Sequence, residues 1–285
     1  MKALAEFVMR GRLQSLLVAM AGAGSLLLCW VSAAVIALVT LRRGAGQGAW
    51  LLLWALLPAG ALMLVFGDGG PLALLVATTA LALVLRATVS LPLAILASVP
   101  VAVLSGFGLL LFGQVMLEQL VGVFDQFLAG LEQQLAASNG QVVRLLRPTG
   151  VQIAGMMGTA TGVLSVICLL LARWWQALLY NPGGFGAEFR ALHYPPAITL
   201  AMVVPGLLLA SLGMEYRTWA VMCLIPLNFA GIALVHARVA WRGQGSGRLT
   251  VFYLLWLFLD PVKLVVVAAA VADSWLRFRQ RWVSK

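Results

Sequence analysis

Long apolar runs, separated by short polar or Gly- and Pro-containing breaks, make up most of the chain. Such breaks end helices, because Gly tolerates positive φ angles and Pro cannot continue the hydrogen-bond ladder. A helix needs roughly 20 residues to cross a hydrocarbon core about 30 Å thick. The pattern predicts an all-α protein, a polytopic transmembrane helical bundle with about eight to ten hydrophobic segments, of which the first and last are short or broken. The predicted segments are 13–28, 30–41, 49–66, 71–85, 91–112, 151–172, 197–213, 218–237 and 249–272.

The first and last apolar runs each leave two topologies open. The run Leu13–Leu41 is too long for one upright span and short for two, and it contains Gly22 and Gly24 in its middle. We predict two short helices there, with a tight turn or kink between them. The run that starts at Leu249 breaks at Asp260-Pro261-Val262-Lys263 and ends in a basic tail. It is either one bent span or two half-spans that return to the same side.

Residues 114–137 have the pattern of an amphipathic helix. Acidic residues recur with a period of seven at Glu118, Asp125 and Glu132, and apolar residues take the alternating heptad core positions. Two roles fit this pattern: a partner-docking helix or short coiled coil, and a helix lying on the membrane surface or on its own bundle. Three heptads are few for a coiled coil, so the second role is favoured. The acidity argues against attraction to anionic lipid.

Composition narrows the class of protein. Of the 285 residues, 62% are hydrophobic and 10% are charged, with a mean hydropathy of +1.01, whereas soluble domains carry roughly 25% charged residues. No water-soluble fold of this length would hide so much apolar surface. The net charge is +10. Because the basic residues are spread between apolar runs, they predict membrane topology and argue against nucleic-acid binding.

The distribution of Lys and Arg favours doubled-back ends. If the first and last runs each crossed once, ten of these residues would lie on one side and eight on the other. If both double back, one side holds only Arg144, Arg147 and Arg217, and Lys263 sits at the break. The other side then holds fifteen: Lys2, Arg10, Arg12, Arg42, Arg43, Arg86, Arg173, Arg190, Arg238, Arg242, Arg248, Arg277, Arg279, Arg281 and Lys285. By the positive-inside rule, both termini are predicted to be cytoplasmic, in a bacterial inner membrane, with the 114–137 helix outside.

Catalysis and metal binding are disfavoured by the residues present. The predicted spans contain no Ser–His or Cys–His pairing, no HExxH motif and no paired carboxylates. Cys29, Cys168 and Cys223 each lie inside an apolar run without a CxxC neighbour, and the two histidines are far apart in sequence. We therefore expect that the protein is not an enzyme and binds no metal and no cofactor.

Two features are candidates for function or helix packing. Asp260 and Lys263 lie one helical turn apart at the break; buried in the membrane they would form a functional pair, whereas at the far membrane face they would be hydrated turn residues. The charge distribution favours the hydrated turn. Gly158-Thr-Ala-Thr-Gly162 provides a small-xxx-small face for close helix approach. Packing within the chain is favoured over dimerisation, because a polytopic bundle offers many neighbours.

Several short motifs resemble those of a membrane-protein family. They are Asn228–His236, the broken element after it, Asp273–Arg279, Arg42-Arg43-Gly44 and the segment 174–186. Together they resemble the YybS-like predicted membrane proteins, a family of unknown function, over the whole chain. That family is distantly similar to the substrate-binding membrane subunits (S components) of energy-coupling-factor transporters. S components have six helices, a short broken opening pair and an Ala-x-x-x-Ala face for the transmembrane coupling subunit.

The resemblance implies a domain organisation. It implies an S-component-like six-helix core over 1–172, a cytoplasmic linker over 173–195, and C-terminal membrane helices with a basic tail over 196–285. Ala19 and Ala23 have the Ala-x-x-x-Ala spacing, as do Ala33 and Ala37. The spans beyond residue 195 exceed those of a six-helix S component.

Two functions remain open. One is a small-molecule binding or transport-related membrane protein that needs partner subunits, since the chain carries no ATPase motif. The alternative is a non-catalytic scaffold or assembly factor that recruits partner proteins through the 114–137 helix or the basic tail. A polar cavity open to the outer face would support the first, and a solid apolar core the second. The candidate ligand-binding residues are Trp30, Trp50, Trp54, Asp68 and Gln114.

Overall fold

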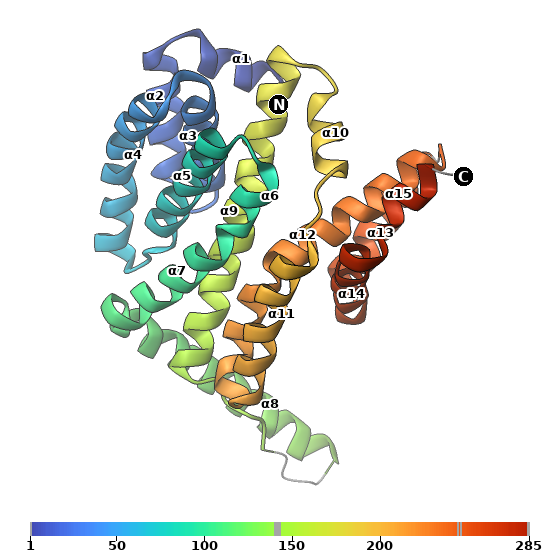
Figure 1. The fold of residues 1–285 in the computed structure, drawn as a ribbon. Coiled ribbons are helices and arrows are strands. Elements are labelled where there is room, and N and C mark those ends of the chain that lie inside the picture. Colours follow the sequence, from blue (N-terminus) through green and yellow to red (C-terminus); the bar gives the residue numbers. More distant parts are fainter. Residues whose placement is uncertain (1, 140–143, 244, 246, 284–285) are drawn as a thin grey trace.

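The fold is entirely helical over the residues that the structure, a computed structural model, describes: 2–139, 144–243, 245 and 247–283 (Figure 1). No strand occurs among these residues, so the all-α prediction is confirmed. The helices are α1 (Lys2–Arg10), α2 (Arg12–Ala23), α3 (Cys29–Arg43), α4 (Ala45–Phe66), α5 (Gly70–Thr88), α6 (Leu91–Leu96), α7 (Ser98–Phe112), α8 (Gln114–Asn139), α9 (Gly150–Tyr180), α10 (Gly184–Arg190), α11 (Pro196–Ser211), the 3-10 helix η1 (Met214–Tyr216), α12 (Arg217–Trp241), α13 (Gly247–Phe258), α14 (Asp260–Leu276) and α15 (Phe278–Val283).

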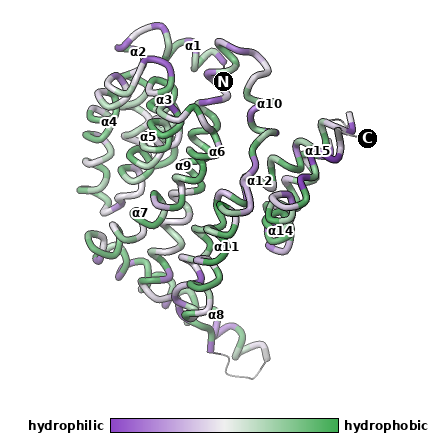
Figure 2. Tube along the Cα trace, viewed as in Figure 1, coloured by the Kyte–Doolittle hydropathy of each residue, from purple (hydrophilic) through white to green (hydrophobic). Residues whose placement is uncertain are grey.

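The number of membrane-length helices is lower than the predicted number of hydrophobic segments. Within the described residues, five helical stretches are long and apolar enough to cross a membrane, namely α4, α5, α6 with α7, α9, and η1 with α12. The bent pair α13 and α14 raises this to six. The predicted count of eight to ten hydrophobic segments is not confirmed. Helices α2, α3, α11 and α13 each fall short of the roughly 20 residues that a crossing requires. The apolar helices support a membrane location, and Figure 2 shows hydrophobic residues along the body of the bundle.

The first apolar run folds as a helical hairpin, as its central glycines predicted. The Ser32 hydroxyl in α3 donates to the Ala19 carbonyl in α2 at 2.7 Å. Arg43, the last residue of α3, donates from Nη2 to the Met9 carbonyl at 2.7 Å. Helix α3 therefore returns to the end of the bundle where α2 begins.

The last apolar run also changes direction at the predicted break. Helices α13 and α14 meet at a bend of 113° beside Asp260. The Trp256 indole N–H, one turn before the break, donates to Asn228 Oδ1 at 3.2 Å. Asn228 lies eleven residues after the first residue of α12 and thirteen before the last. The turn therefore lies beside the middle of α12, short of the far end that the sequence favoured.

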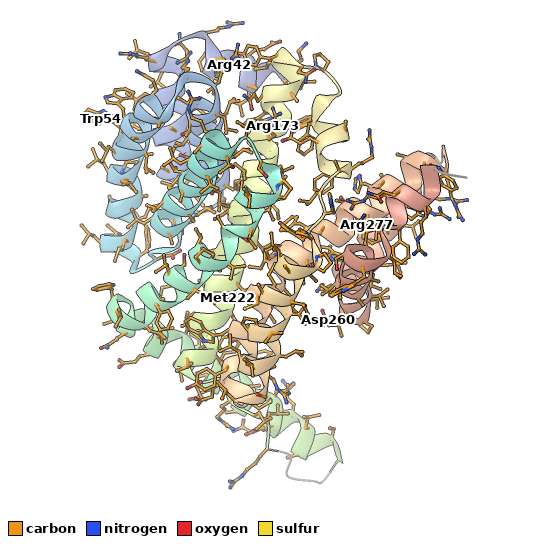
Figure 3. All side chains as sticks on the ribbon, in the orientation of Figure 1. Arg42, Trp54, Arg173, Met222, Asp260 and Arg277 are labelled. Atoms are coloured by element: carbon orange, nitrogen blue, oxygen red, sulfur yellow. The ribbon has the colours of Figure 1, made fainter. Side chains whose placement is uncertain are left out.

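Arginines gather at the end of the bundle that holds the N-terminus. The Arg86 guanidinium donates to the Leu41 carbonyl at 2.8 Å, and that of Arg42 lies 3.9 Å from the centre of the Tyr180 ring. Arg173 pairs with Glu188 at 2.8 Å, and Figure 3 shows Arg42 and Arg173 at this end. At the opposite end, Gln152 at the start of α9 donates to the Met214 carbonyl beside the start of α12 at 3.1 Å.

Glycines bring α7, α9 and α12 into close contact along a seam. A Cβ on Gly158 in α9 would lie 2.5 Å from the Ala102 carbonyl oxygen of α7 and 2.7 Å from Met222 Cε of α12. A Cβ on Gly162, one turn further on, would lie 2.8 Å from Ala102 Cβ. Both glycines are buried. The small-residue face of α9 therefore lies against α7 and α12 of the same chain.

No helix ends at residue 172, where the implied core meets the implied linker. Helix α9 continues without interruption through residues 172 and 173 to Tyr180. Trp175, which falls inside the implied linker over 173–195, is fully buried. The C-terminal segment is also joined to the rest, because Trp219 of α12 donates from Nε1 to the Val151 carbonyl of α9 at 3.0 Å.

Candidate functional site

A pocket of about 950 Å3 opens between α4, α5, α7, α8 and α9. It lies around the turn that joins α4 to α5, at the end of these helices away from Arg43 and Arg86. Local chain chemistry builds this turn. Gly67 takes a left-handed φ of 71° at the end of α4, and the Asp68 carboxylate accepts from the Gly70 N–H at 2.8 Å. This contact closes an Asx turn just before α5, whose N-cap is Gly69.

Apolar side chains and small residues line most of the pocket. The small residues leave room between helices that are otherwise rich in Leu and Val. No charged side chain lines the pocket among the described residues. The apolar and glycine lining consists of Leu56, Met63, Val65, Phe66, Gly67, Gly69, Gly70, Leu72, Ala73, Val76, Ala77, Ala80, Val101, Leu104, Gly108, Leu109, Phe112, Gly113, Val115, Met116 and Met157.

Three polar side chains complete the lining: Ser105, Gln119 and Thr161. The Ser105 hydroxyl donates to the Val101 carbonyl at 2.8 Å, and that of Thr161 donates to the Met157 carbonyl at 3.0 Å. Each hydroxyl therefore donates its proton to a carbonyl of its own helix, while its oxygen can still accept a hydrogen bond from a ligand. The Gln119 amide has no hydrogen-bond partner among the described residues, and it can both donate and accept. The site can therefore orient a molecule through a few neutral hydrogen bonds.

Helix α8, which supplies Gln119, is fastened at its other half. Arg147, which precedes α9, contacts Asp125 at 3.3 Å and Glu132 at 3.1 Å. The hydrogen bond from Arg147 lowers the pKa of the Glu132 carboxyl, and a second bond from the Leu145 N–H acts in the same direction. Two of the three predicted acidic positions are thus paired within the chain. The amphipathic helix predicted at 114–137 is confirmed as a helix that leaves the bundle (Figure 1).

None of the five predicted ligand-binding side chains lines the pocket. Trp50 and Trp54 lie on the outer face of α4 with their ring centroids 6.3 Å apart, and Trp30 is partly buried against the core. Asp68 and Gln114 come closest, because their chain neighbours line the pocket. The structure therefore has the break between the predicted segments 49–66 and 71–85, but side chains other than the five predicted ones line the pocket beside it.

The side chains that do line the pocket were missed for an identifiable reason. Ser105 and Thr161 lie inside apolar spans, where a hydroxyl commonly bonds back to its own helix. Gln119 lies on the amphipathic helix, where polar residues are expected on a solvated face. One signal was present: a glutamine one turn from the helix start, just after a glycine break at Gly113.

The predicted helix-packing alanines are buried inside the protein. Ala19 and Ala23 in α2 are completely inaccessible, and so are Ala33 and Ala37 in α3. Their faces are used by the hairpin and its neighbours. They are not available for docking a coupling subunit.

Asp260 and Lys263 form an ion pair with each other at 2.8 Å. The side chain of Asp260 is 89% exposed and that of Lys263 is 38% exposed. The pair is therefore not buried in the protein, and it does not take part in the pocket.

The motif segments 228–236 and 273–279 meet on the broken pair. His236 and Tyr253 share a hydrogen bond of 2.7 Å between Nε2 and the hydroxyl. Asp273 accepts from the Phe278 N–H at 2.9 Å and contacts Arg279 at 3.8 Å. The first contact fastens α13 to α12, and the contacts of Asp273 fasten α15 to α14. Arg279 also donates from Nη2 to the Ala230 carbonyl of α12 at 3.5 Å.

No protein-family model, curated protein or solved structure matches the chain. The resemblance to the YybS-like membrane proteins therefore stays a prediction. Within the described residues, no group of three or more His, Cys, Asp or Glu side chains is placed to hold a metal ion.

Proposed function

We propose that this protein is a small-molecule-binding membrane protein, related to transport, whose ligand occupies the pocket between α4, α5, α7, α8 and α9. The observation that carries the proposal is the pocket itself, about 950 Å3 with an apolar lining and three polar side chains. Small-molecule sites commonly measure roughly 300–1,000 Å3 and combine an apolar wall with a few polar groups.

The ligand is uncharged and mainly apolar, with one or two hydrogen-bonding groups. A charged ligand would lose its hydration without meeting an opposite charge in the lining. Gln119 both donates to and accepts from the ligand, while Ser105 and Thr161 accept. The many Leu, Val and Met side chains bury the rest of its surface.

The proposed setting is a bacterial inner membrane with both termini in the cytoplasm. The arginine-rich end around Arg42 and Arg173 then faces the cytoplasm, in accordance with the positive-inside rule. The pocket lies at the other end of α4 and α5 and takes its ligand from the outer side. Helix α8 lies on that side as well.

Transport would require partner subunits, since the sequence has no ATPase motif. A coupling subunit would have to bind elsewhere than on the alanine faces, because Ala19, Ala23, Ala33 and Ala37 are buried. This differs from the layout that the S-component resemblance implies. The proposal therefore commits to ligand binding and leaves coupling to surfaces outside the opening hairpin.

Filling the pocket tests the proposal. A Cβ on Gly108 meets no atom within 4 Å, so Gly108→Trp places an indole in the pocket without a backbone clash. Gly46→Trp is the matched control. A Cβ on Gly46 also meets no atom within 4 Å, and Gly46 lies at the end of α4 away from the pocket. Each protein is extracted in native lipid nanodiscs, and native mass spectrometry records molecules bound to the 30.4 kDa chain.

We expect one small molecule to accompany the wild type and Gly46→Trp, and to be lost from Gly108→Trp. The proposal fails if no molecule accompanies the wild type. It also fails if Gly108→Trp, folded like the wild type by circular dichroism, keeps the same adduct.

A scaffold that recruits other proteins is the second candidate function. It is favoured by α8, whose Phe127 and Val123 side chains are exposed away from the bundle. A partner that co-purifies with the wild type and is lost from Phe127→Ser would support it. In that case Gly108→Trp would leave the partner bound.

A further inference from the structure

Helix α13 is joined to α12 by the hydrogen bonds of Tyr253 and Trp256, yet much of its surface is uncovered. None of its residues is buried. Its outer surface continues across the bend onto the first turns of α14 and is strongly apolar. The exposed apolar side chains of this broken-pair face are Val251, Leu254, Leu255, Leu257, Phe258, Leu259, Leu264 and Val265.

The ion pair at the bend lies at membrane depth. The bond from Trp256 to Asn228 sets the end of α13 beside the middle of α12, which is a candidate span. The 12 residues of α13 rise about 18 Å, a little over half of a hydrocarbon core of about 30 Å. Asp260 and Lys263 therefore lie inside the apolar layer when α12 crosses it. Figure 3 shows Asp260 well above α8, beside the body of the bundle.

Charged side chains at this depth face protein or water rather than lipid. Yet Asp260 is 89% exposed, and its recorded ion-pair partner is Lys263 of the same turn. Contact with lipid is favourable for the apolar residues around the pair, but it is costly for the charged carboxylate of Asp260. The broken-pair face therefore needs a cover that supplies a positive charge opposite Asp260 and a negative charge opposite Lys263.

We infer that a second copy of this chain provides that cover, through a two-fold contact between the two broken-pair faces. In a two-fold interface the same patch is used by both copies, so a residue of one copy meets its complement on the other. Asp260 and Lys263 are of opposite sign and one turn apart. A two-fold axis between them brings Asp260 of each copy to Lys263 of the other, and four charges form one neutral cluster. This dimer is independent of the proposed ligand pocket, which lies on other helices.

Reversing the charges tests the inference in trans. Asp260→Lys carries two positive charges at the bend, and Lys263→Asp carries two negative charges. Two differently tagged copies of one variant are co-expressed, extracted in native lipid nanodiscs, and captured through the first tag. We expect the second tag to be recovered with the wild type, and its recovery to fall at least tenfold with either single variant.

Co-expression of tagged Asp260→Lys with tagged Lys263→Asp is the decisive arm. Each copy now offers charges that complement the other, so recovery of the second tag returns to near the wild-type level. The rescue also shows that both variants fold. The reversal Lys2→Glu, at the exposed pair of Lys2 with Glu6 on α1, is the control and leaves recovery unchanged.

Four results overturn the inference. The wild type is captured without its second copy; the single reversals leave recovery unchanged; or the mixed pair recovers no more than each variant alone. Capture of a different membrane protein that is lost in both single variants also overturns it, since the cover is then another chain.

Discussion

Two glycines of helix α7, Gly106 and Gly108, have opposite surroundings. A Cβ on Gly106 would lie 2.9 Å from the Trp219 ring and 3.1 Å from the Ala154 carbonyl oxygen, so this glycine is required for contact with α9 and α12. Gly108, two residues on, has no atom within 4 Å of a Cβ and faces the pocket. Glycine therefore allows close helix contact at one position and leaves space for the pocket at the other. Small residues in this bundle therefore mark either tight contact or vacant space, depending on the face they occupy.

Substitution in the glycine seam should have the largest effect. In Gly158→Leu the new side chain meets the Ala102 carbonyl and Met222, both from neighbouring helices. We expect a loss of about 3 kcal/mol in unfolding free energy, the upper end of ordinary overpacking costs. The unfolding midpoint in detergent, followed by tryptophan fluorescence, measures it.

Gly108→Ala tests the glycine that faces the pocket. Because its Cβ meets open space, it should raise stability by about 0.5–1 kcal/mol through lower conformational freedom of the unfolded chain. Equal destabilisation by both substitutions would contradict the distinction between seam and pocket.

A second tight contact joins α12 to the broken pair. Gly231 lies directly against the Val266 backbone, with no room for a side chain. Gly231→Leu should push α14 away from α12 while the seam stays closed. In a background without the three native cysteines, cysteines replacing Asn228 and Trp256 should crosslink readily, and Gly231→Leu should abolish the crosslink. An unchanged crosslink would mean that the broken pair is held by other contacts.

The polar part of the pocket should have a moderate effect. Gln119→Leu keeps the size of the side chain and removes the one amide that faces the pocket without a partner. Loss of one or two neutral hydrogen bonds costs about 1 kcal/mol, or roughly fivefold in ligand occupancy. Native mass spectrometry of the bound molecule checks this. A substitution on the surface of α8, Gln126→Leu, should leave occupancy unchanged.

The smallest expected effect is a pH dependence of the α8 anchor. The pKa of Glu132 is lowered by Arg147, so the folded state keeps this carboxylate charged at pH values where an unfolded chain would protonate it. The anchor is fully present above the usual pKa of about 4.3 for glutamate and is lost as pH falls through the lowered folded value. Spin labels on α8 and near Leu145 should show broader distance distributions at low pH. Glu132→Gln should show the broad distribution at every pH.

Local chain chemistry made the helix boundaries predictable. The Arg42-Arg43-Gly44 break, the Gly67–Pro71 turn and the Asp260-Pro261 break each end or start a helix in the structure. These signals act over a few residues, so the sequence contains them in full. The amphipathic helix was predictable for the same reason.

The pocket and the depth of the bend were not predictable, because they depend on how helices are oriented to one another. Nothing in the local sequence separates Gly106 from Gly108, or marks Gln119 as facing inward. Similarly, Trp175 falls inside the implied linker over 173–195, yet it is fully buried. The turn at Asp260 was recognised from sequence, but its level beside Asn228 depends on a contact between distant segments.

Helix α9 joins the two ends of the protein as one unbroken rod. Its 31 residues contain no proline and rise about 46 Å, more than the thickness of a hydrocarbon core. Met157 and Thr161, near one end, line the pocket, and Arg173, near the other, pairs with Glu188 on α10. A stiff helix tilts as a unit, so displacement at the pocket wall is carried to the Arg173–Glu188 contact. Under the proposed function, α9 would therefore link ligand binding at the pocket wall to the Arg173–Glu188 contact.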